Sequence, residues 1–349
     1  REVNVKNMEE KPMRKNETNV RKEHEAIRNS VGYYDFTHQL LEVKGPDAQA
    51  FLNKMLVASI GKMEIGEAKY TTMLNDDGII IDDVIVFRVE KEVFWISTLY
   101  IDALIAWFDA HKENAKVEYR DITEKTTMYA VQGPDSRAVL NDFLKDNIDS
   151  MKYFTIENNM VGDIPVKIAR SGYTGELGFE IYCSPEDKTF IEEKLADSGK
   201  QFDIKKITTD VIITSLPREK GFVLMSDLAG TNPLEADFGW TVDWNKDFVG
   251  KSALEKVKAN GAKRKLIGFT VEDDAAQVKP GADVKVGGLV AGKVTMFTYG
   301  YTVEKNIGFA LVDVDKAKIG DAAVVGDGID AVLSERVFYD PENRRVRGK

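Results

Sequence analysis

The sequence predicts an α+β protein whose chain ends in an all-β domain. Residues 40–56 and 128–144 share one pattern, in which an apolar strand is followed by Gly-Pro-Asp and an amphipathic helix. From about residue 264 the chain changes to short stretches rich in Val and Gly, which are typical of a small barrel or sandwich. The repeated unit is consistent with two related α+β modules. The independent use of the same turn motif at two places in the chain explains it equally well. A chain of 349 residues is expected to form two or three domains.

Hydrophobic periodicity and turn residues predict the elements between these landmarks. Residues 1–23 are polar and charged, and a short helix is expected over residues 22–32. The first Gly-Pro-Asp unit is followed by three expected strands and an amphipathic helix, at residues 68–76, 78–90, 92–98 and 100–112. The second is followed by two strands, joined by Ser-Gly-Tyr-Thr-Gly-Glu-Leu-Gly, and by a helix at residues 186–199. Residues 203–260 mix both patterns and end in a helix.

Composition argues against several classes of function. The chain has 48 Lys and Arg against 58 Asp and Glu, and this net charge of −10 disfavours nucleic acid as a partner, although a local basic pocket is compatible with it. A single cysteine, Cys183, can form neither an intrachain disulfide nor a Cys-based zinc cluster, and three histidines disfavour a His-rich metal site. The first residues do not resemble a secretory signal, and no apolar run is long enough to cross a bilayer. We therefore expect a cytoplasmic protein with no metal and no membrane partner.

Two adjacent carboxylates interrupt a strongly apolar strand and form the first candidate site. Asp82 and Asp83 lie between Ile79-Ile80-Ile81 and Val84-Ile85-Val86. Because alternate residues of a strand face opposite sides, at least one carboxylate is expected in or beside the core. A buried carboxylate is costly unless it is paired or faces a polar cavity. A purely structural carboxylate is the competing interpretation, and on spacing alone it is the more common one.

The second candidate site is the glycine-rich segment 171–182, Ser-Gly-Tyr-Thr-Gly-Glu-Leu-Gly-Phe-Glu-Ile-Tyr. Its glycines allow close approach of the backbone. Glu180 follows in the next strand, where its carboxylate could accept two parallel hydrogen bonds from a planar, amidine-like edge. A hairpin whose glycines serve only the turn explains the pattern equally well. The segment lacks the Gly-Lys-Ser/Thr ending of a phosphate-binding P-loop.

Four other residues are weaker candidates. Trp240 and Trp244 are expected in the core or in the wall of a cavity rather than as stacking platforms. His38 beside aromatic residues is expected to be a packing residue. Cys183 lies in a predicted strand without a nearby histidine, so we expect it to be buried and inert.

A series of sequence blocks occurs in one order along the chain: GYYDFTH, GPDAQAFL, YTTMLNDDGIIIDDVIV, VQGPDS, GYTGELGFEIY, NPLEADFGWTVDW with DFVGKSAL, and GKVT with NIGFALV. Over about residues 23–345 these blocks resemble the aminomethyltransferase (glycine cleavage T-protein) family of tetrahydrofolate-dependent enzymes. The resemblance implies a three-domain cloverleaf around a central folate channel. The implied domains are residues 1–39 with 123–199, a ferredoxin-like domain of residues 40–122 with 200–262, and a C-terminal β-barrel at residues 263–349.

The resemblance also implies particular site residues. Asp83 is expected beside the reacting nitrogens of the folate as the catalytic group, and Glu180 is expected to hold the N3–H and 2-amino edge of the pterin. Phe94 aligns with an aromatic residue that stacks beside the pterin. Tyr173 belongs to the Gly-Tyr-Thr-Gly-Glu block and is expected to contact the cofactor.

The chain departs from the family where the family contacts the rest of the folate. The family stretch Arg-Asp-Ser-Leu-Arg-Leu-Glu corresponds here to VIITSLPREKGF, so that Ile213 stands at the position of the first Arg. Arg218 stands one step from the second Arg, and either it or another basic residue is expected to supply the missing contact. The pterin contacts are expected to be retained and the donor side changed. The departures favour a divergent, demethylase-type member.

The resemblance therefore implies an enzyme with tetrahydrofolate as its cofactor. It would move a methyl or aminomethyl group to tetrahydrofolate from a small donor molecule or from a lipoylated carrier protein. The alternative is a non-catalytic folate-binding module of the same fold.

Overall fold

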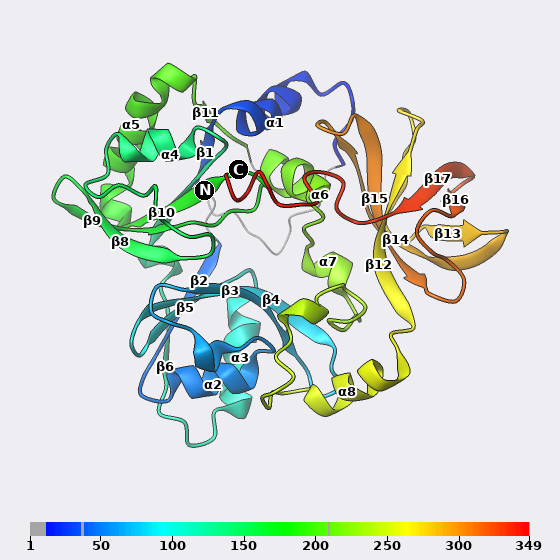
Figure 1. The fold of residues 1–349 in the computed structure, drawn as a ribbon, viewed down its shortest axis with the longest axis horizontal. Helices are drawn as coiled ribbons and strands as arrows, with labels where there is room; N and C mark the ends of the chain where they lie inside the picture. Colours follow the sequence, from blue (N-terminus) through cyan, green and yellow to red (C-terminus); the bar gives the residue numbers. More distant parts are fainter. Residues whose placement is uncertain (1–11, 36–37, 209, 349) are drawn as a thin grey trace.

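The computed structural model describes residues 12–35, 38–208 and 210–348, so the first part of the polar N-terminal segment lies outside the described residues. Three β-structures surround the middle of the molecule (Figure 1): sheet A at the upper left, sheet B at the lower left and a barrel at the right. The predicted α+β class with a C-terminal barrel is confirmed.

Sheet A has six strands in the order β11-β1-β7-β10-β9-β8. They are β1 (Gly32–Tyr34), β7 (Thr127–Gln132), β8 (Ile156–Val161), β9 (Ile164–Ala169), β10 (Gly178–Cys183) and β11 (Lys205–Lys206). Alternation along β10 places Phe179, Ile181 and Cys183 in the core shared with the helices α4 (Ser136–Asn141) and α5 (Lys188–Gly199). The expected burial of Cys183 is confirmed, and this burial raises the pKa of its thiol to about 11. Glu180 and Tyr182 lie on the other face of the sheet.

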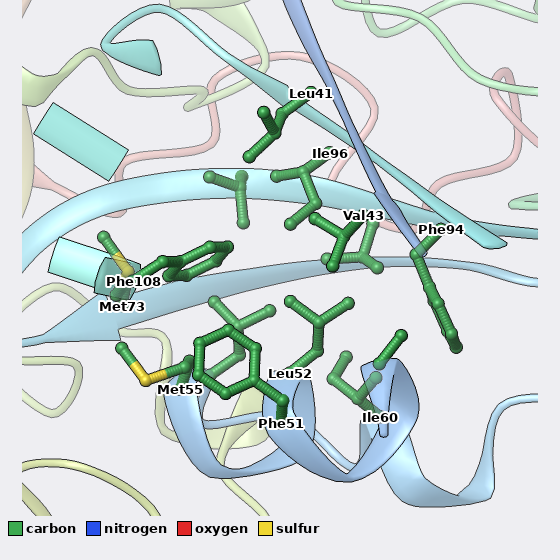
Figure 2. Close-up of a cluster of buried hydrophobic side chains, with 14 of the residues drawn as sticks. Leu41, Val43, Phe51, Leu52, Met55, Ile60, Met73, Phe94, Ile96 and Phe108 are labelled. Carbon is green, nitrogen blue, oxygen red and sulfur yellow. The ribbon is translucent and has the colours of Figure 1, made fainter. Parts of the chain in front are cut away.

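Sheet B has five strands in the order β3-β4-β5-β2-β6. They are β2 (Gln39–Lys44), β3 (Ala68–Leu74), β4 (Ile80–Glu90), β5 (Val93–Thr98) and β6 (Glu118–Asp121), with the helices α2 (Ala48–Met55) and α3 (Ile101–His111). Figure 2 shows the core between this sheet and its helices, where Phe51 and Leu52 of α2 pack below Val43 and Ile96. The other face of sheet B is directed toward sheet A.

Both Gly-Pro-Asp turns require glycine for the same physical reason. Gly45 joins β2 to α2 with φ 137°, and Gly133 joins β7 to α4 with φ 122°. A Cβ would lie 2.2 Å from the carbonyl oxygen of Lys116 at the first turn and 2.3 Å from that of Ser30 at the second. Because both obstacles are backbone atoms, neither turn can accommodate a side chain. The predicted strand–turn–helix units are confirmed at both places.

The C-terminal domain is a closed barrel in the strand order β12-β15-β14-β13-β16-β17. Its strands are β12 (Arg264–Val271), β13 (Asp283–Val286), β14 (Leu289–Gly300), β15 (Lys305–Asp313), β16 (Ala322–Val325) and β17 (Ile329–Ser334). The helix α8 (Lys251–Asn260) precedes it. Closure pairs both edges of the sheet, which explains why a segment of short Val- and Gly-rich strands forms a stable unit.

Short helices occupy the space between the three β-structures (Figure 1). They are α1 (Thr18–Asn29), a π-helical turn (Val211–Ser215), α6 (Leu216–Glu219) and α7 (Met225–Leu228). Single-turn 3₁₀ helices cover Ile60–Lys62, Thr123–Lys125, Pro185–Asp187, Lys200–Phe202 and Gly239–Thr241. In the part of the chain that the structure describes, no helix is both long and apolar enough to span a membrane.

The three β-structures are built from segments that interleave along the chain. Sheet B uses residues 39–121, the barrel uses residues 264–334, and sheet A uses residues on both sides of sheet B. One segment differs from the predicted division. Lys205 and Lys206 form β11, which pairs in parallel with β1 of sheet A, whereas residues 200–262 were expected in the second domain. The other domain boundaries stay predictions.

A buried arginine connects three separate parts of the chain. Arg28 of α1 is 4% exposed. Its Nη1 donates to the carbonyl of Thr174 at 2.6 Å and to Glu176 at 3.3 Å. Its Nη2 donates to the carbonyl of Leu216 at 3.1 Å and to Glu219 at 3.0 Å. Both carboxylates are buried, so Arg28 supplies the charge that compensates them.

The barrel and the C-terminal segment join the same group of charges. Thr302, in the turn between β14 and β15, accepts from Nε of Arg28 at 3.1 Å and donates its backbone N–H to Glu219 at 2.6 Å. Arg345 donates to Glu176 at 2.9 Å. We call Arg28, Glu176, Glu219 and Arg345 the interdomain ion cluster, because it ties sheet A, the central helices and the barrel together.

Candidate active site

A cavity of about 1040 Å³ lies between the three β-structures, at the upper end of the size range of ligand pockets. Sheet B contributes Tyr70 and Asp83 to its wall, and the glycine-rich segment after β9 contributes Tyr173. The segment after the central helices contributes Trp240, and the chain beyond the last barrel strand contributes Arg336. The wall is therefore assembled from parts of the sequence that lie more than 260 residues apart.

Asp83 lies on the face of β4 that is directed into this cavity. It pairs across the sheet with Thr72 of β3, and the hydroxyl of Tyr70 donates to its Oδ2 at 2.9 Å. Burial raises the pKa of Asp83 to about 6, although the hydrogen bond from Tyr70 opposes this rise. A carboxylate with such a pKa can both hold and release a proton near neutral pH.

The structure separates the two adjacent carboxylates, because side chains alternate along β4. Asp82 lies on the opposite face, 2% exposed, and accepts from the hydroxyl of Thr98 at 2.6 Å. Burial raises the pKa of Asp82 to about 7, although the hydrogen bond from Thr98 opposes this rise. Asp82 therefore fits the structural interpretation of the pair, whereas Asp83 is the carboxylate that faces the cavity.

The glycine-rich segment brings Tyr173 to the cavity and Glu180 close to it. The hydroxyl of Tyr173 donates to the carbonyl of Val223 at 2.6 Å, and its ring stacks on Phe222 with centroids 5.5 Å apart. Glu180 does not itself line the cavity that the described residues enclose. Its carboxylate accepts from the hydroxyls of Ser171 at 2.8 Å and Tyr182 at 2.9 Å, and burial raises its pKa.

Phe94 does not lie at the cavity, which corrects the expected stacking position. Its side chain is fully buried in the core between sheet B and its helices (Figure 2). Residues of β5 alternate, so Phe94 and Ile96 face the helices while Trp95 faces sheet A. An alignment of sequence blocks does not reveal on which face of the sheet an aromatic residue lies.

Other aromatic residues form the flat walls of the cavity. Tyr70 stacks against Trp240 with centroids 6.5 Å apart and an interplanar angle of 27°. Trp240 is 74% exposed, and its expected place in a wall is confirmed. Phe238 contacts the edge of Tyr70 with centroids 5.3 Å apart. Sequence reasoning missed Tyr70 and Phe238, although each of them lies in one of the quoted blocks.

Of the two alternatives for the missing basic contact, Arg218 or another basic residue, the cavity wall contains only residues other than Arg218 among those described. Arg218 is fully buried, and its Nη1 donates to Asp227 at 2.6 Å, away from the cavity wall. The cations that line the wall are Lys62, Lys69, Lys220, Arg336 and Arg347. No signal in the local sequence identifies them, because each is brought to the cavity by the packing of distant segments.

The chain thus forms two sheets and a closed barrel, with one large cavity between them. Comparison with known proteins identifies the family to which a chain of this fold belongs. Residues 5–246 match the family described as GCVT N-terminal domain, and residues 264–340 match the glycine cleavage T-protein C-terminal barrel domain. The chain belongs to the glycine cleavage T-protein family, which confirms the resemblance found in the sequence.

Relatives and a solved structure agree with this assignment. An aminomethyltransferase from Alkaliphilus oremlandii (strain OhILAs) is 32% identical over 336 residues, which cover 93% of this chain and 90% of that protein. An aminomethyltransferase from Bacillus mycoides (strain KBAB4) is 33% identical over 337 residues, which cover 92% and 90%. The crystal structure of glycine cleavage system aminomethyltransferase T from Bartonella henselae is similar with a TM-score of 0.83 at 25% identity, over 92% of this chain and 90% of that one.

Proposed function

We propose that this protein is a tetrahydrofolate-dependent aminomethyltransferase in which Asp83 is the catalytic group. The observation that carries the proposal is the position of Asp83, a carboxylate with a raised pKa, in the wall of a large cavity lined by sheet B, by the glycine-rich segment after β9 and by the chain beyond β17. Membership of the glycine cleavage T-protein family supplies the reaction class. The names of its relatives support the same class.

The residues around the cavity fit tetrahydrofolate. The stacked rings of Tyr173 and Phe222, and of Tyr70 and Trp240, offer flat surfaces that suit a pterin and a benzoyl ring. The lysines and arginines in the wall suit the anionic tail. The carboxylate of Glu180 is held by two hydroxyls and lies close to the cavity, beside the glycine-rich segment. It would accept hydrogen bonds from the edge of a pterin bound against this segment. Phe94 is left out of the proposed site, because it is buried in the core.

When bound, tetrahydrofolate supplies the nitrogen that takes up the one-carbon unit. Asp83 would orient the bound amine and accept the proton that this amine gives up. The hydroxyl of Tyr70 occupies Oδ2, so we assign the proton to Oδ1. With a pKa of about 6, the carboxylate is mostly charged at pH 7 and ready to accept a proton. The aromatic walls would hold the reactants in line, which contributes to the rate by orientation.

The donor is proposed to be an aminomethyl group on a lipoylated carrier protein or a small methylated molecule. The first choice follows from the family, since the solved relative is named as part of a glycine cleavage system. The second follows from Ile213, which is buried where the resemblance places the first arginine of the family.

A binding and turnover experiment tests the proposed function. Calorimetry with tetrahydrofolate is expected to show one site, and ligand at about 100 times Kd is expected to stabilise the fold by about 2.7 kcal/mol. An aminomethylated lipoyl carrier and small methyl donors are then supplied, and one-carbon folate products and ammonia are measured. Binding without turnover from any donor would support the non-catalytic module, and the absence of folate binding would contradict both.

Replacing Tyr70 with Phe is expected to move the acid limb of the pH–rate profile. A charged Asp83 is required for proton uptake, so activity is present above pH 6 and is lost as the pH falls through about 6. The hydroxyl of Tyr70 stabilises the charged form, so its removal raises the pKa of Asp83 and moves the midpoint upward, by roughly one pH unit for a hydrogen bond to a charged group.

The measurement is kcat/KM between pH 5 and 8.5. Tyr153→Phe is the matched control, because Tyr153 also lines the cavity but is not a hydrogen-bond partner of Asp83 among the described contacts. Equal midpoints in the wild type and in both variants would show that Tyr70 does not tune this carboxylate.

A further inference from the structure

Arg336 lies in the cavity wall just beyond the end of β17. Its Nε donates to the carbonyl of Gly221 at 3.0 Å and its Nη1 to the carbonyl of Ala236 at 2.8 Å. The guanidinium packs over the ring of Phe238 at 5.3 Å from the centroid. These contacts fix the orientation of the side chain, and in the described part of the chain no carboxylate forms an ion pair with it, although the charge of Asp237 acts on it from a greater distance.

Several basic residues in and around the wall have a carboxylate partner. Lys220 pairs with Asp340 at 3.1 Å, Lys62 with Asp243 at 3.6 Å, and the buried Arg218 with Asp227. Lys69 and Arg347 resemble Arg336, because no ion pair is formed by either of them among the described residues. No carboxylate among the described residues forms an ion pair with Arg336. Burial lowers the pKa of Arg336, and the charge of Asp237 opposes this change.

The position of Arg336 relates it to the carboxylate that we propose as catalytic. Phe238 separates the guanidinium from Tyr70, and the hydroxyl of Tyr70 contacts Asp83. Arg336 and Asp83 therefore stand on the same wall with aromatic side chains between them. A ligand whose anionic end binds Arg336 would lie along these rings toward Asp83.

We infer that Arg336 is a carboxylate-binding residue of the cavity. The inference rests on the proposed function and narrows its substrate class. A planar guanidinium with two of its N–H groups already oriented presents the remaining ones to a carboxylate, which is the ligand best matched to this geometry. The carboxylate belongs either to a small anionic one-carbon donor or to the folate tail. The proximity of Arg336 to Tyr70 and Asp83 favours the donor.

The test compares Arg336→Gln with Lys54→Gln, which removes the same charge from an exposed residue outside the cavity wall, where it pairs with Glu113. Calorimetry uses two ligand pairs that differ in the carboxylate: N,N-dimethylglycine with its carboxamide, and tetrahydrofolate with 6-methyltetrahydropterin. In Arg336→Gln we expect a 10- to 100-fold loss of affinity for the carboxylate member of one pair and no change for its partner. Lys54→Gln is expected to stay within about threefold of the wild type for the same ligands.

The pattern of loss identifies the source of the carboxylate. A loss confined to dimethylglycine assigns the residue to the donor, and a loss confined to tetrahydrofolate assigns it to the tail. The inference is overturned if Arg336→Gln binds both carboxylates as the wild type does, or if both members of a pair weaken equally. Arg336→Lys keeps the positive charge and loses the planar guanidinium. Its affinity for the carboxylate is expected to lie between those of the wild type and Arg336→Gln, and it provides a second variant in case Arg336→Gln does not fold. Failure of wild-type protein to bind either folate ligand would contradict the proposed function instead.

Discussion

Replacing Asp83 with Asn is expected to lower kcat by roughly 10²- to 10⁴-fold, the range in which a positioned acid–base group contributes. The amide has nearly the shape of the carboxylate, so Tyr70 keeps a hydrogen-bond partner and the cavity keeps its form. The amide cannot accept a proton, however, and the loss should appear in kcat. Turnover at saturating tetrahydrofolate and donor measures kcat, and calorimetry shows whether the folate still binds.

The neighbouring Asp82→Asn provides the matched control. It makes the same chemical change one residue away, on the face of β4 that is directed to the core, where Thr98 is its partner. It is expected to retain kcat within a few-fold, with any effect confined to stability. If Asp83→Asn turns over as fast as Asp82→Asn, Asp83 is not part of the mechanism.

Replacing Arg28 with Met is expected to lower the free energy of unfolding by about 3–5 kcal/mol, the cost of removing one partner from a buried ion pair. Met preserves much of the apolar stem but leaves the buried carboxylates of Glu176 and Glu219 without their shared counter-ion. Glu176 retains Arg345, whereas Glu219 retains His24 at 3.4 Å, whose pKa is lowered by burial, so Glu219 is expected to carry the larger part of the penalty. Urea denaturation followed by circular dichroism gives the difference.

The control for this variant is Arg21→Met on the same helix. Arg21 forms longer ion pairs with Glu25 at 3.6 Å and Glu304 at 3.9 Å, both with partly exposed side chains. Its replacement is expected to change stability by less than about 1 kcal/mol. A loss of similar size in both variants would mean that the interdomain ion cluster has no special part in holding sheet A, the central helices and the barrel together.

The helices, strands and turns could be predicted from local sequence patterns, because periodicity and turn preferences depend on neighbouring residues. The two Gly-Pro-Asp units are the clearest case, since the predicted turns at Gly45 and Gly133 are present and both glycines adopt positive φ angles. The closed barrel follows from its short Val- and Gly-rich strands in the same way. The pairing of β11 with β1 was not predictable, because two lysines carry no pattern that selects one sheet over another.

The site was only partly predictable, for a related reason. Asp83 stood out because a carboxylate in an apolar strand is costly, and the structure places it at the cavity. Phe94 was placed on the wrong face, because a shift of one residue reverses the direction of a side chain in a strand. Arg218, one of the two alternatives for the missing basic contact, is paired with Asp227 in the interior, and the local sequence did not identify the cations that line the wall.

The sequence by itself determined the class of fold, the family and the carboxylate that we propose to act in the reaction. Each of these rests on residues close together in the chain or on the order of whole blocks. Only the tertiary structure decided which aromatic rings and which cations surround that carboxylate. Tyr70, Phe238 and Arg336 come together with Asp83 because sheet B, the central segment and the end of the barrel pack around one cavity, and contacts across such distances in the chain leave no local pattern in a single sequence.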